Sequence, residues 1–353
     1  MRTSVEHSDI TQLDHTECST PLFVLSVWRS GSSLLYALLN QHSKIALLYE
    51  GDLPRLHSFL WGRFHNGAWR ERWEFWNQGP SRHGISIESM PANASNAWEA
   101  TRIVYQEVAR RKHATVWGEK TPHWYDCPLS MAHKFPEARF IFLWRDVHAV
   151  MDSIYRAALS DRFFRKAGFT NKVLVGMENL KLAYEVMKRR GRLVHEVNYE
   201  DLTSNTSECM QQICRFLEIP FESRISSLEG ADRTAISRGE HHTMVRGNTV
   251  VAGRRQQNNL LSTALQAKLS RYVCRWKRRY EGSWPKYPLI TPEAARPVSQ
   301  LELCGDRIVY QTVLWRDKLV ALIYALVPMD VAQRLRGWVR QRTRVAGPLA
   351  VSE

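Results

Sequence analysis

The sequence predicts an α/β fold in which a central parallel sheet is flanked by helices. Residues 21–28 and 139–144 are short, nearly continuous apolar runs, which are typical of parallel strands buried on both faces. Residues 192–198 follow a long helical segment and form a third candidate strand. Because strands that alternate with helices favour a parallel sheet covered on both sides, we expect this architecture for most of the chain.

Helical segments separate and follow these strands. The longest ends in Lys188-Arg189-Arg190-Gly191, a basic last turn followed by a glycine, which is typical of a helix C-terminus. Residues 221–258 are polar and irregular, so we expect a long loop there. The segments predicted to be helical are residues 34–39, 96–113, 125–134, 147–159, 171–190, 207–217 and 260–280.

The composition divides the chain into four segments. Residues 1–20 are a polar N-terminal arm, and residues 21–284 contain the predicted α/β domain. Residues 285–300 hold four prolines and are predicted to be a linker. Residues 301–353 are predicted to form a basic helical C-terminal appendage.

The appendage joins an apolar run to a basic one. Residues 319–327 are nine consecutive apolar residues, which are too few to cross a bilayer. Residues 331–345 then carry five arginines and no acidic residue. This pattern is compatible with a helical hairpin docked on the domain, and equally with a segment that lies on an anionic membrane surface.

The composition also restricts the class of protein. The net charge of +14 favours anionic partners such as nucleic acid, a phosphorylated cofactor, an acidic glycan or a membrane surface. The 13 tryptophans, 12 tyrosines and 12 phenylalanines exclude a predominantly disordered chain. The six cysteines form no Cys-x-x-Cys pair, so neither a disulfide framework nor a zinc module is expected. The polar N-terminus lacks a secretory signal pattern, which predicts a cytoplasmic location.

A small-residue loop joins the first strand to the first helix. Backbone N–H groups at such a junction converge on an anion, and the helix dipole favours negative charge there. Gly31 permits close approach of a ligand, and Arg29 adds a planar charged fork. The loop lacks the Gly-Lys-Ser/Thr of a Walker A motif, so it is P-loop-like only, and an ordinary turn is the alternative. The proposed anion-binding residues of the loop are Arg29, Ser30, Gly31, Ser32 and Ser33.

A second candidate anion site follows the strand over residues 139–144. Arg145 ends this strand, and Ser153 lies in the next helix, so both are expected at the carboxyl end of the sheet, where open α/β folds bind ligands. Residues 117–122 (Trp-Gly-Glu-Lys-Thr-Pro) and 197–202 (Val-Asn-Tyr-Glu-Asp-Leu) form two further distinctive segments.

Four segments, which are residues 29–33, residues 117–122, Arg145 with Ser153, and residues 197–202, occur in this order along the chain. In kind and order they resemble segments of the sulfotransferases that use 3′-phosphoadenosine-5′-phosphosulfate (PAPS), most of all their bacterial and tyrosylprotein-type branch. The resemblance covers residues 20–260. It implies that residues 29–33 bind the 5′-phosphosulfate and that Arg145 and Ser153 bind the 3′-phosphate. It further implies that PAPS is the co-substrate and that no metal is required. The other residues that the resemblance assigns to the nucleotide site are Tyr199, Gly247 and Asn248.

The resemblance also implies catalytic roles. Sulfuryl transfer requires positioning, a base and cations near the leaving oxygen. Arg29 and Lys120 are the expected cations, and Glu50, counted from Arg29, matches the position of a catalytic glutamate. A salt bridge between Lys120 and Glu119 is the structural alternative for this lysine. The rival candidates for the base are Asp52, Glu119 and His123.

The function predicted from these observations is sulfuryl transfer from PAPS to a hydroxyl or amine of a glycan, a lipid or a small molecule. A P-loop-type nucleotide kinase or phosphotransferase is an alternative, against which the missing Walker lysine counts. A basic nucleic-acid-binding protein is a weaker alternative, because the basic residues are dispersed and no binding motif is present. The expected partners are therefore PAPS, an acceptor and, through the appendage, an anionic membrane surface, but no nucleic acid.

Overall fold

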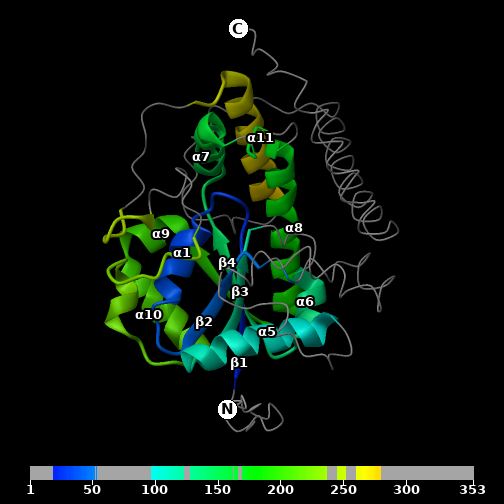
Figure 1. The fold of residues 1–353 in the computed structure, drawn as a ribbon. Coiled ribbons are helices and arrows are strands. Elements are labelled where there is room, and N and C mark those ends of the chain that lie inside the picture. Colours follow the sequence, from blue (N-terminus) through cyan, green and yellow to red (C-terminus); the bar gives the residue numbers. More distant parts are fainter. Residues whose placement is uncertain are drawn as a thin grey trace, which may run out of the picture.

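The computed structural model describes residues 19–51, 53, 97–122, 128–161, 163–165, 169–236, 245–251 and 260–279. At its centre is a five-stranded sheet in the order β2-β3-β1-β4-β5, in which every neighbouring pair is parallel (Figure 1). This confirms the predicted α/β fold with a central parallel sheet. The strands are β1 (Thr20–Leu25), β2 (Ile45–Tyr49), β3 (Val116–Thr121), β4 (Arg139–Trp144) and β5 (Leu193–Asn198).

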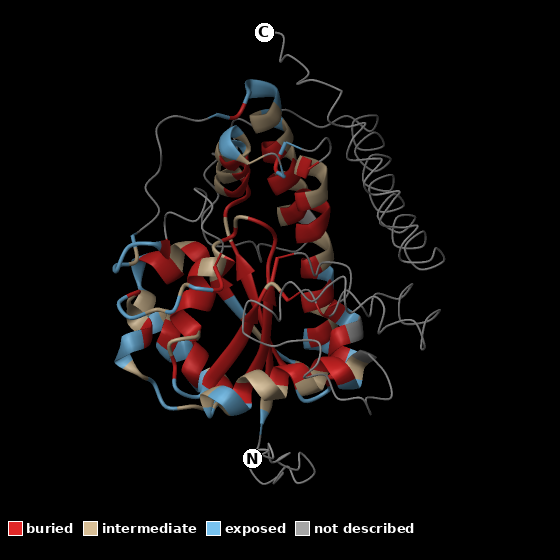
Figure 2. Cartoon of the chain, viewed as in Figure 1, coloured by how far each residue is buried: buried red, intermediate tan, exposed pale blue. Residues whose placement is uncertain are grey.

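Helices cover both faces of the sheet, and each face has its own hydrophobic core (Figure 2). Strand β4 is buried along its whole length and β1 at every residue but Thr20, as their apolar sequences predict. One face packs against α1 (Ser32–Leu39), α9 (Tyr199–Ser204), α10 (Thr206–Leu217) and the short 3-10 helix η3 (Ser223–Ser226). The other face packs against α5 (Ala97–Lys112), α6 (Pro128–Lys134) and α8 (Phe169–Arg189).

Two helices extend the molecule beyond the carboxyl ends of the strands (Figure 1). Helix α7 (Val147–Ser160) follows β4, and α11 (Thr263–Arg279) packs beside it. The Tyr272 hydroxyl of α11 donates to the carbonyl oxygen of Leu174 in α8 at 3.1 Å, and the Trp276 ring lies 6.3 Å from that of Trp144. These contacts hold α11 against the edge of the sheet where β4 ends.

Strand β3 lacks the apolar pattern by which the sequence predicts a buried strand. Glycine, glutamate and lysine are depleted in strands, and β3 contains Gly118, Glu119 and Lys120. Both charged side chains are nevertheless fully buried, and both have polar partners. A Cβ atom on Gly118 would lie 2.0 Å from the carbonyl oxygen of Leu22 in β1. Glycine is therefore required for the close approach of β1 and β3.

Several predicted features lie outside the described residues. They are most of the N-terminal arm, the linker over 285–300, the appendage over 301–353 and two of the candidate bases, Asp52 and His123. Within the described ranges, no helix is long and apolar enough to cross a membrane.

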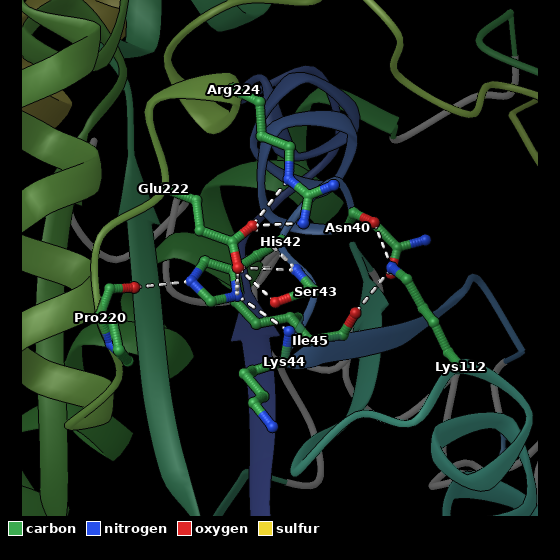
Figure 3. A network of polar contacts seen from close by, with 9 residues as sticks. All are labelled: Asn40, His42, Ser43, Lys44, Ile45, Lys112, Pro220, Glu222 and Arg224. Atoms are coloured by element: carbon green, nitrogen blue, oxygen red, sulfur yellow. Dashed lines mark hydrogen bonds and ion pairs between the residues drawn. The ribbon is translucent and has the colours of Figure 1, made fainter.

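A polar network joins the turn between α1 and β2 to two other segments, at the amino-terminal edge of the sheet (Figure 3). His42 is fully buried, and its Nε2 donates to the carbonyl oxygen of Pro220 at 2.7 Å. Its Nδ1 accepts from the backbone N–H of Lys44 at 3.0 Å. Because the Pro220 carbonyl can only accept and the Lys44 N–H can only donate, these two contacts fit the tautomer that carries its proton on Nε2. Lys112, at the end of α5, donates to the carbonyl oxygen of Ile45 at 2.7 Å.

Glu222 completes this network and makes it sensitive to acid. Burial alone raises the pKa of Glu222, but hydrogen bonds from Ser43 and Arg224 outweigh it and lower the pKa to about 2, from 4.5. A carboxyl whose pKa is lower in the folded chain stabilises the fold above its unfolded pKa. That contribution is lost as the pH falls through the folded value.

We expect Glu222→Gln to lower the free energy of unfolding at pH 7, because the glutamine cannot form the ionic contact. The difference from the wild type should shrink as the pH falls from about 4.5 to about 2, because in that range the carboxyl of the unfolded chain gains its proton before that of the folded chain. Urea unfolding followed at several pH values measures this difference. A difference that stays constant from pH 7 to pH 3 would contradict the role of the ionised carboxyl.

Candidate active site

The carboxyl ends of the five strands bring the candidate residues of distant segments to one edge of the sheet. In the pairing register, Leu25 of β1 lies opposite Thr121 of β3, and Tyr49 of β2 lies opposite Lys120. Trp144 of β4 lies opposite Asn198 of β5. The residues that immediately follow these positions therefore gather at the same edge, which is where parallel α/β sheets bind ligands.

The loop between β1 and α1 has the backbone of an anion cradle. Arg29 and Gly31 both have positive φ, 66° and 94°, and Gly31 is the N-cap of α1. A Cβ on Gly31 would lie 2.2 Å from the Tyr199 ring, so glycine is needed for both its conformation and its contact. Ser30 is buried, and its hydroxyl has no hydrogen-bond partner among the described residues. The loop therefore offers polar groups that the fold itself does not satisfy.

The two arginines of the predicted anion sites lie side by side. An Arg145 N–H group donates to the backbone carbonyl oxygen of Arg29 at 2.8 Å, and the Arg145 guanidinium lies 4.2 Å from the centre of the Tyr199 ring. Burial, and next the charge of Arg145, lower the pKa of Arg29 to about 10, so Arg29 still carries its charge at neutral pH. The buried Nε of Arg145 has no hydrogen-bond partner within the described part of the chain. Two neighbouring cations with an unused donor fit a bound phosphate group.

Ser153 lies at this site, where it contacts the arginine of the phosphate loop. Its hydroxyl oxygen accepts from Nε of Arg29 at 3.0 Å. The Arg29 guanidinium also lies 5.9 Å from the centre of the Phe164 ring. Helix α7 thus holds the side chain of the loop arginine, so the two predicted anion sites form one continuous cluster.

Lys120 and Glu50 form a buried ion pair beside this cluster. Nζ of Lys120 lies 2.8 Å from a carboxylate oxygen of Glu50, the lysine side chain is 0% exposed and the glutamate side chain is 29% exposed. The backbone N–H of Glu50 donates to the carbonyl oxygen of Lys120 at 2.9 Å. Glu50 has a positive φ of 50°, a conformation that is uncommon outside glycine and costs energy, and such strain is found most often at functional sites.

Tyr49 is a residue of this site that the sequence analysis did not single out. Its ring centre lies 3.7 Å from Nζ of Lys120, a cation–π contact that is strong when both groups are buried. Its hydroxyl group is 2.8 Å from the hydroxyl of Ser33 in the phosphate loop. Tyr49 therefore connects the loop to the Lys120–Glu50 pair. Its position before Glu50 at the end of a strand is the only sequence signal for this role.

Glu119 faces the other side of the sheet, because successive residues of a strand point to opposite faces. The Tyr105 hydroxyl of α5 donates to its carboxylate at 2.7 Å, and the hydroxyl of Thr121 donates to the same carboxylate. These contacts place Glu119 in the core formed with α5, and Lys120 pairs with Glu50 rather than with Glu119. Glu50 and Glu119 are the two candidate bases that lie in the described residues, and the ion pair described for Lys120 is with Glu50.

Gly247 and Asn248 are both exposed and lie near η3. The carbonyl oxygen of Asn248 accepts from the backbone N–H of Leu228 at 2.9 Å, and that of Gly247 accepts from Arg233 at 3.0 Å. These contacts anchor the segment to residues 228–233. They do not connect it to the arginine cluster.

The arrangement places two sets of charged groups side by side. Arg29 and Arg145 gather positive charge beside the loop, and the Lys120–Glu50 pair places an ammonium group next to a carboxylate, which are the groups that leaving-group stabilisation and general-base catalysis require. The described residues contain no cluster of three or more histidine, cysteine, aspartate or glutamate side chains that could hold a metal ion.

Known sulfotransferases are similar to this chain in sequence and in fold. Residues 21–223 match a family model described as "Sulfotransferase family". Protein-tyrosine sulfotransferase A of Caenorhabditis elegans is 24% identical over 229 residues, which are 63% of this chain and 55% of that protein. The chain thus spans little more than half the length of this relative. The solved sulfotransferase domain from the curacin biosynthetic pathway is similar in fold, with a TM-score of 0.51 at 18% identity, over 76% of this chain and 99% of that domain.

Proposed function

Because the chain belongs to the sulfotransferase family, we propose that it transfers a sulfuryl group from PAPS to a hydroxyl or amine of an acceptor. The observation that supports this proposal most strongly is the meeting of Arg29, Arg145 and the Lys120–Glu50 pair at one edge of the sheet. The acceptor is a glycan, a lipid or a small molecule. The proposed location is the cytoplasm, and the proposed partner of residues 301–353 is an anionic membrane surface.

The two ends of the nucleotide bind to the two halves of the arginine cluster. The loop over residues 29–33 holds the 5′-phosphosulfate through backbone N–H groups, hydroxyls and the Arg29 guanidinium. Arg145 holds the 3′-phosphate, for which its unpartnered buried Nε is a suitable donor. Ser153 contributes its hydroxyl, and Tyr199 supplies an aromatic wall next to Gly31. PAPS supplies the electrophilic sulfur and a bisphosphate leaving group.

The ion pair carries out the proton transfer and stabilises the leaving group. Glu50, as a carboxylate, accepts the proton of the acceptor while the acceptor oxygen or nitrogen forms its bond to sulfur. The bond between sulfur and the bridging phosphate oxygen breaks, and its electron pair remains on that oxygen. Lys120 donates a hydrogen bond to this oxygen as its negative charge develops. The mutual contact of Lys120 and Glu50 holds both side chains in place before the substrates bind.

Ligand binding distinguishes this proposal from the alternatives. We expect adenosine 3′,5′-bisphosphate to stabilise the full chain against heat far more than ATP or DNA at equal concentration, because the ligand that binds the native site most tightly raises the unfolding temperature most.

Arg145→Ala should weaken binding of the bisphosphate by about 1.5–3 kcal/mol, the range for a lost charge-assisted contact, and should affect 5′-AMP much less.

Isothermal titration of both nucleotides measures this difference. Arg110→Ala serves as the control, because Arg110 lies on the exposed side of α5 and pairs with Glu107. Equal weakening of the two nucleotides by Arg145→Ala would contradict the assignment of the 3′-phosphate to Arg145. Stronger stabilisation by ATP would favour the phosphotransferase alternative.

Turnover tests the roles of the ion pair. Glu50→Gln should leave nucleotide affinity nearly unchanged and reduce turnover about 10²–10⁴-fold, the usual contribution of a general base. Lys120→Ala should also reduce turnover, because the leaving oxygen loses its hydrogen-bond donor. Glu208→Gln, on the exposed face of α10, is the control. If Glu50→Gln turns over at the wild-type rate, the base is another residue, and Asp52 and His123 are the next to test.

A further inference from the structure

Glu200 closes a ring of contacts around the base of the arginine cluster. One of its carboxylate oxygens accepts a hydrogen bond from the backbone N–H of Asp146 at 3.1 Å. Asp146 is bonded through the chain to Arg145, and Glu200 is bonded through the chain to Tyr199. Because the Arg145 guanidinium lies 4.2 Å from the Tyr199 ring, two peptide links and two non-covalent contacts form a closed loop of four residues.

This ring of four residues connects the strand ends that carry the two anion sites. Tyr199 begins α9 after β5, and its ring occupies the space next to Gly31 in the phosphate loop. Arg145, after β4, donates to the carbonyl oxygen of Arg29. A shift of α9 relative to the end of β4 would therefore move the Tyr199 ring against Gly31 and remove the surface over which Arg145 is held.

Asp146 fixes the other side of the same junction. Its side chain accepts from the backbone N–H of Ala149 at 2.9 Å and caps α7, so the backbone at Asp146 is held from two directions. Its N–H group, as the donor to Glu200, connects this capped helix end to α9. The second carboxylate oxygen of Glu200 is buried and has no hydrogen-bond partner in the described ranges, so the contact with Asp146 is the one by which Glu200 links α9 to the end of β4.

We propose that Glu200 is a positioning residue that sets the distance between the 5′ and 3′ anion sites, and thereby the preference for a nucleotide that carries a 3′-phosphate. This inference rests on the proposed function, since it concerns the same nucleotide. Glu200 acts through the hydrogen bond to Asp146 and does not touch the ligand. The carboxylate charge also interacts with that of Arg145, but the proposed role belongs to the hydrogen bond: any side chain of the same length with an acceptor oxygen at its end should serve the purpose.

Three substitutions separate the hydrogen bond from the charge. Glu200→Gln keeps the length and the acceptor oxygen but removes the charge. Glu200→Asp keeps the charge but withdraws the acceptor by one methylene group, and Glu200→Ala removes both. Glu208→Asp is the matched control, because Glu208 is exposed in α10 and its described bond is to Gln212 of the same helix.

The measurement is the ratio of affinities for adenosine 3′,5′-bisphosphate and 5′-AMP, together with the thermal unfolding temperature of each full-length variant without ligand. Glu200→Asp and Glu200→Ala should lower this ratio about tenfold, the effect of one lost hydrogen bond to a fixed group. Glu200→Gln and the control should keep the wild-type ratio. Rescue by glutamine distinguishes positioning from a general loss of stability, which would lower the affinity for both nucleotides alike.

Each other outcome overturns a specific statement. A wild-type ratio in Glu200→Asp and Glu200→Ala would overturn the positioning role, and so would equal weakening of both nucleotides. A ratio as low in Glu200→Gln as in Glu200→Asp would show that the charge, and not the hydrogen bond, is responsible, which also overturns the inference. If the proposed function is wrong, the affinity ratio of the wild-type chain shows it, because the wild type would then not prefer the 3′,5′-bisphosphate over 5′-AMP.

Discussion

The guanidinium groups of Arg29 and Arg145 lie close enough together to repel each other in a partly buried site. This repulsion, added to burial, lowers the pKa of Arg29 to about 10. Three contacts of the pair are neutral: the carbonyl oxygen of Arg29, the ring of Tyr199 and the hydroxyl of Ser153. In a partly buried site the two positive charges attract an anion more strongly than they would on an open surface. The proposed roles of the loop, of Tyr199 and of Glu200 all depend on the binding of an anion here.

The parallel sheet explains how residues far apart in sequence come to share this site. Residues at or just after the carboxyl end of each strand lie at the same edge of the sheet. Lys120 reaches this edge from β3, which lies between β1 and β2. Gly118 allows β3 to approach β1, and Glu50 and Tyr49 surround the Lys120 ammonium so that it can be fully buried. Glu119, which precedes Lys120 in β3, points to the opposite face, where the Tyr105 hydroxyl donates to its carboxylate.

Sequence patterns predicted the parallel sheet and the family, which the structure and the family match confirm. Strand β4 occupies the residues 139–144 that its apolar run predicts. The sequence did not predict β3, because contacts with other elements stabilise its charged residues in a strand. The intrinsic strand propensity of a residue does not include such contacts. For the same reason the sequence did not reveal the contact of Arg29 with Ser153 or the position of Tyr49 under Lys120. Side-chain pairing across elements depends on the register of the strands and on rotamers, which a single sequence does not specify.

The most direct test of the account is the fate of a labelled sulfuryl group. The full chain is incubated with sulfur-labelled PAPS and, in parallel, with ATP labelled in its γ-phosphoryl group, over a panel of glycan, lipid, hydroxyl and amine acceptors. The account predicts that sulfur label passes to at least one acceptor class with release of an equal amount of adenosine 3′,5′-bisphosphate, and that Arg145→Ala suppresses this transfer. Transfer of the phosphoryl label to the same panel, with the sulfur label remaining on the nucleotide, would contradict it.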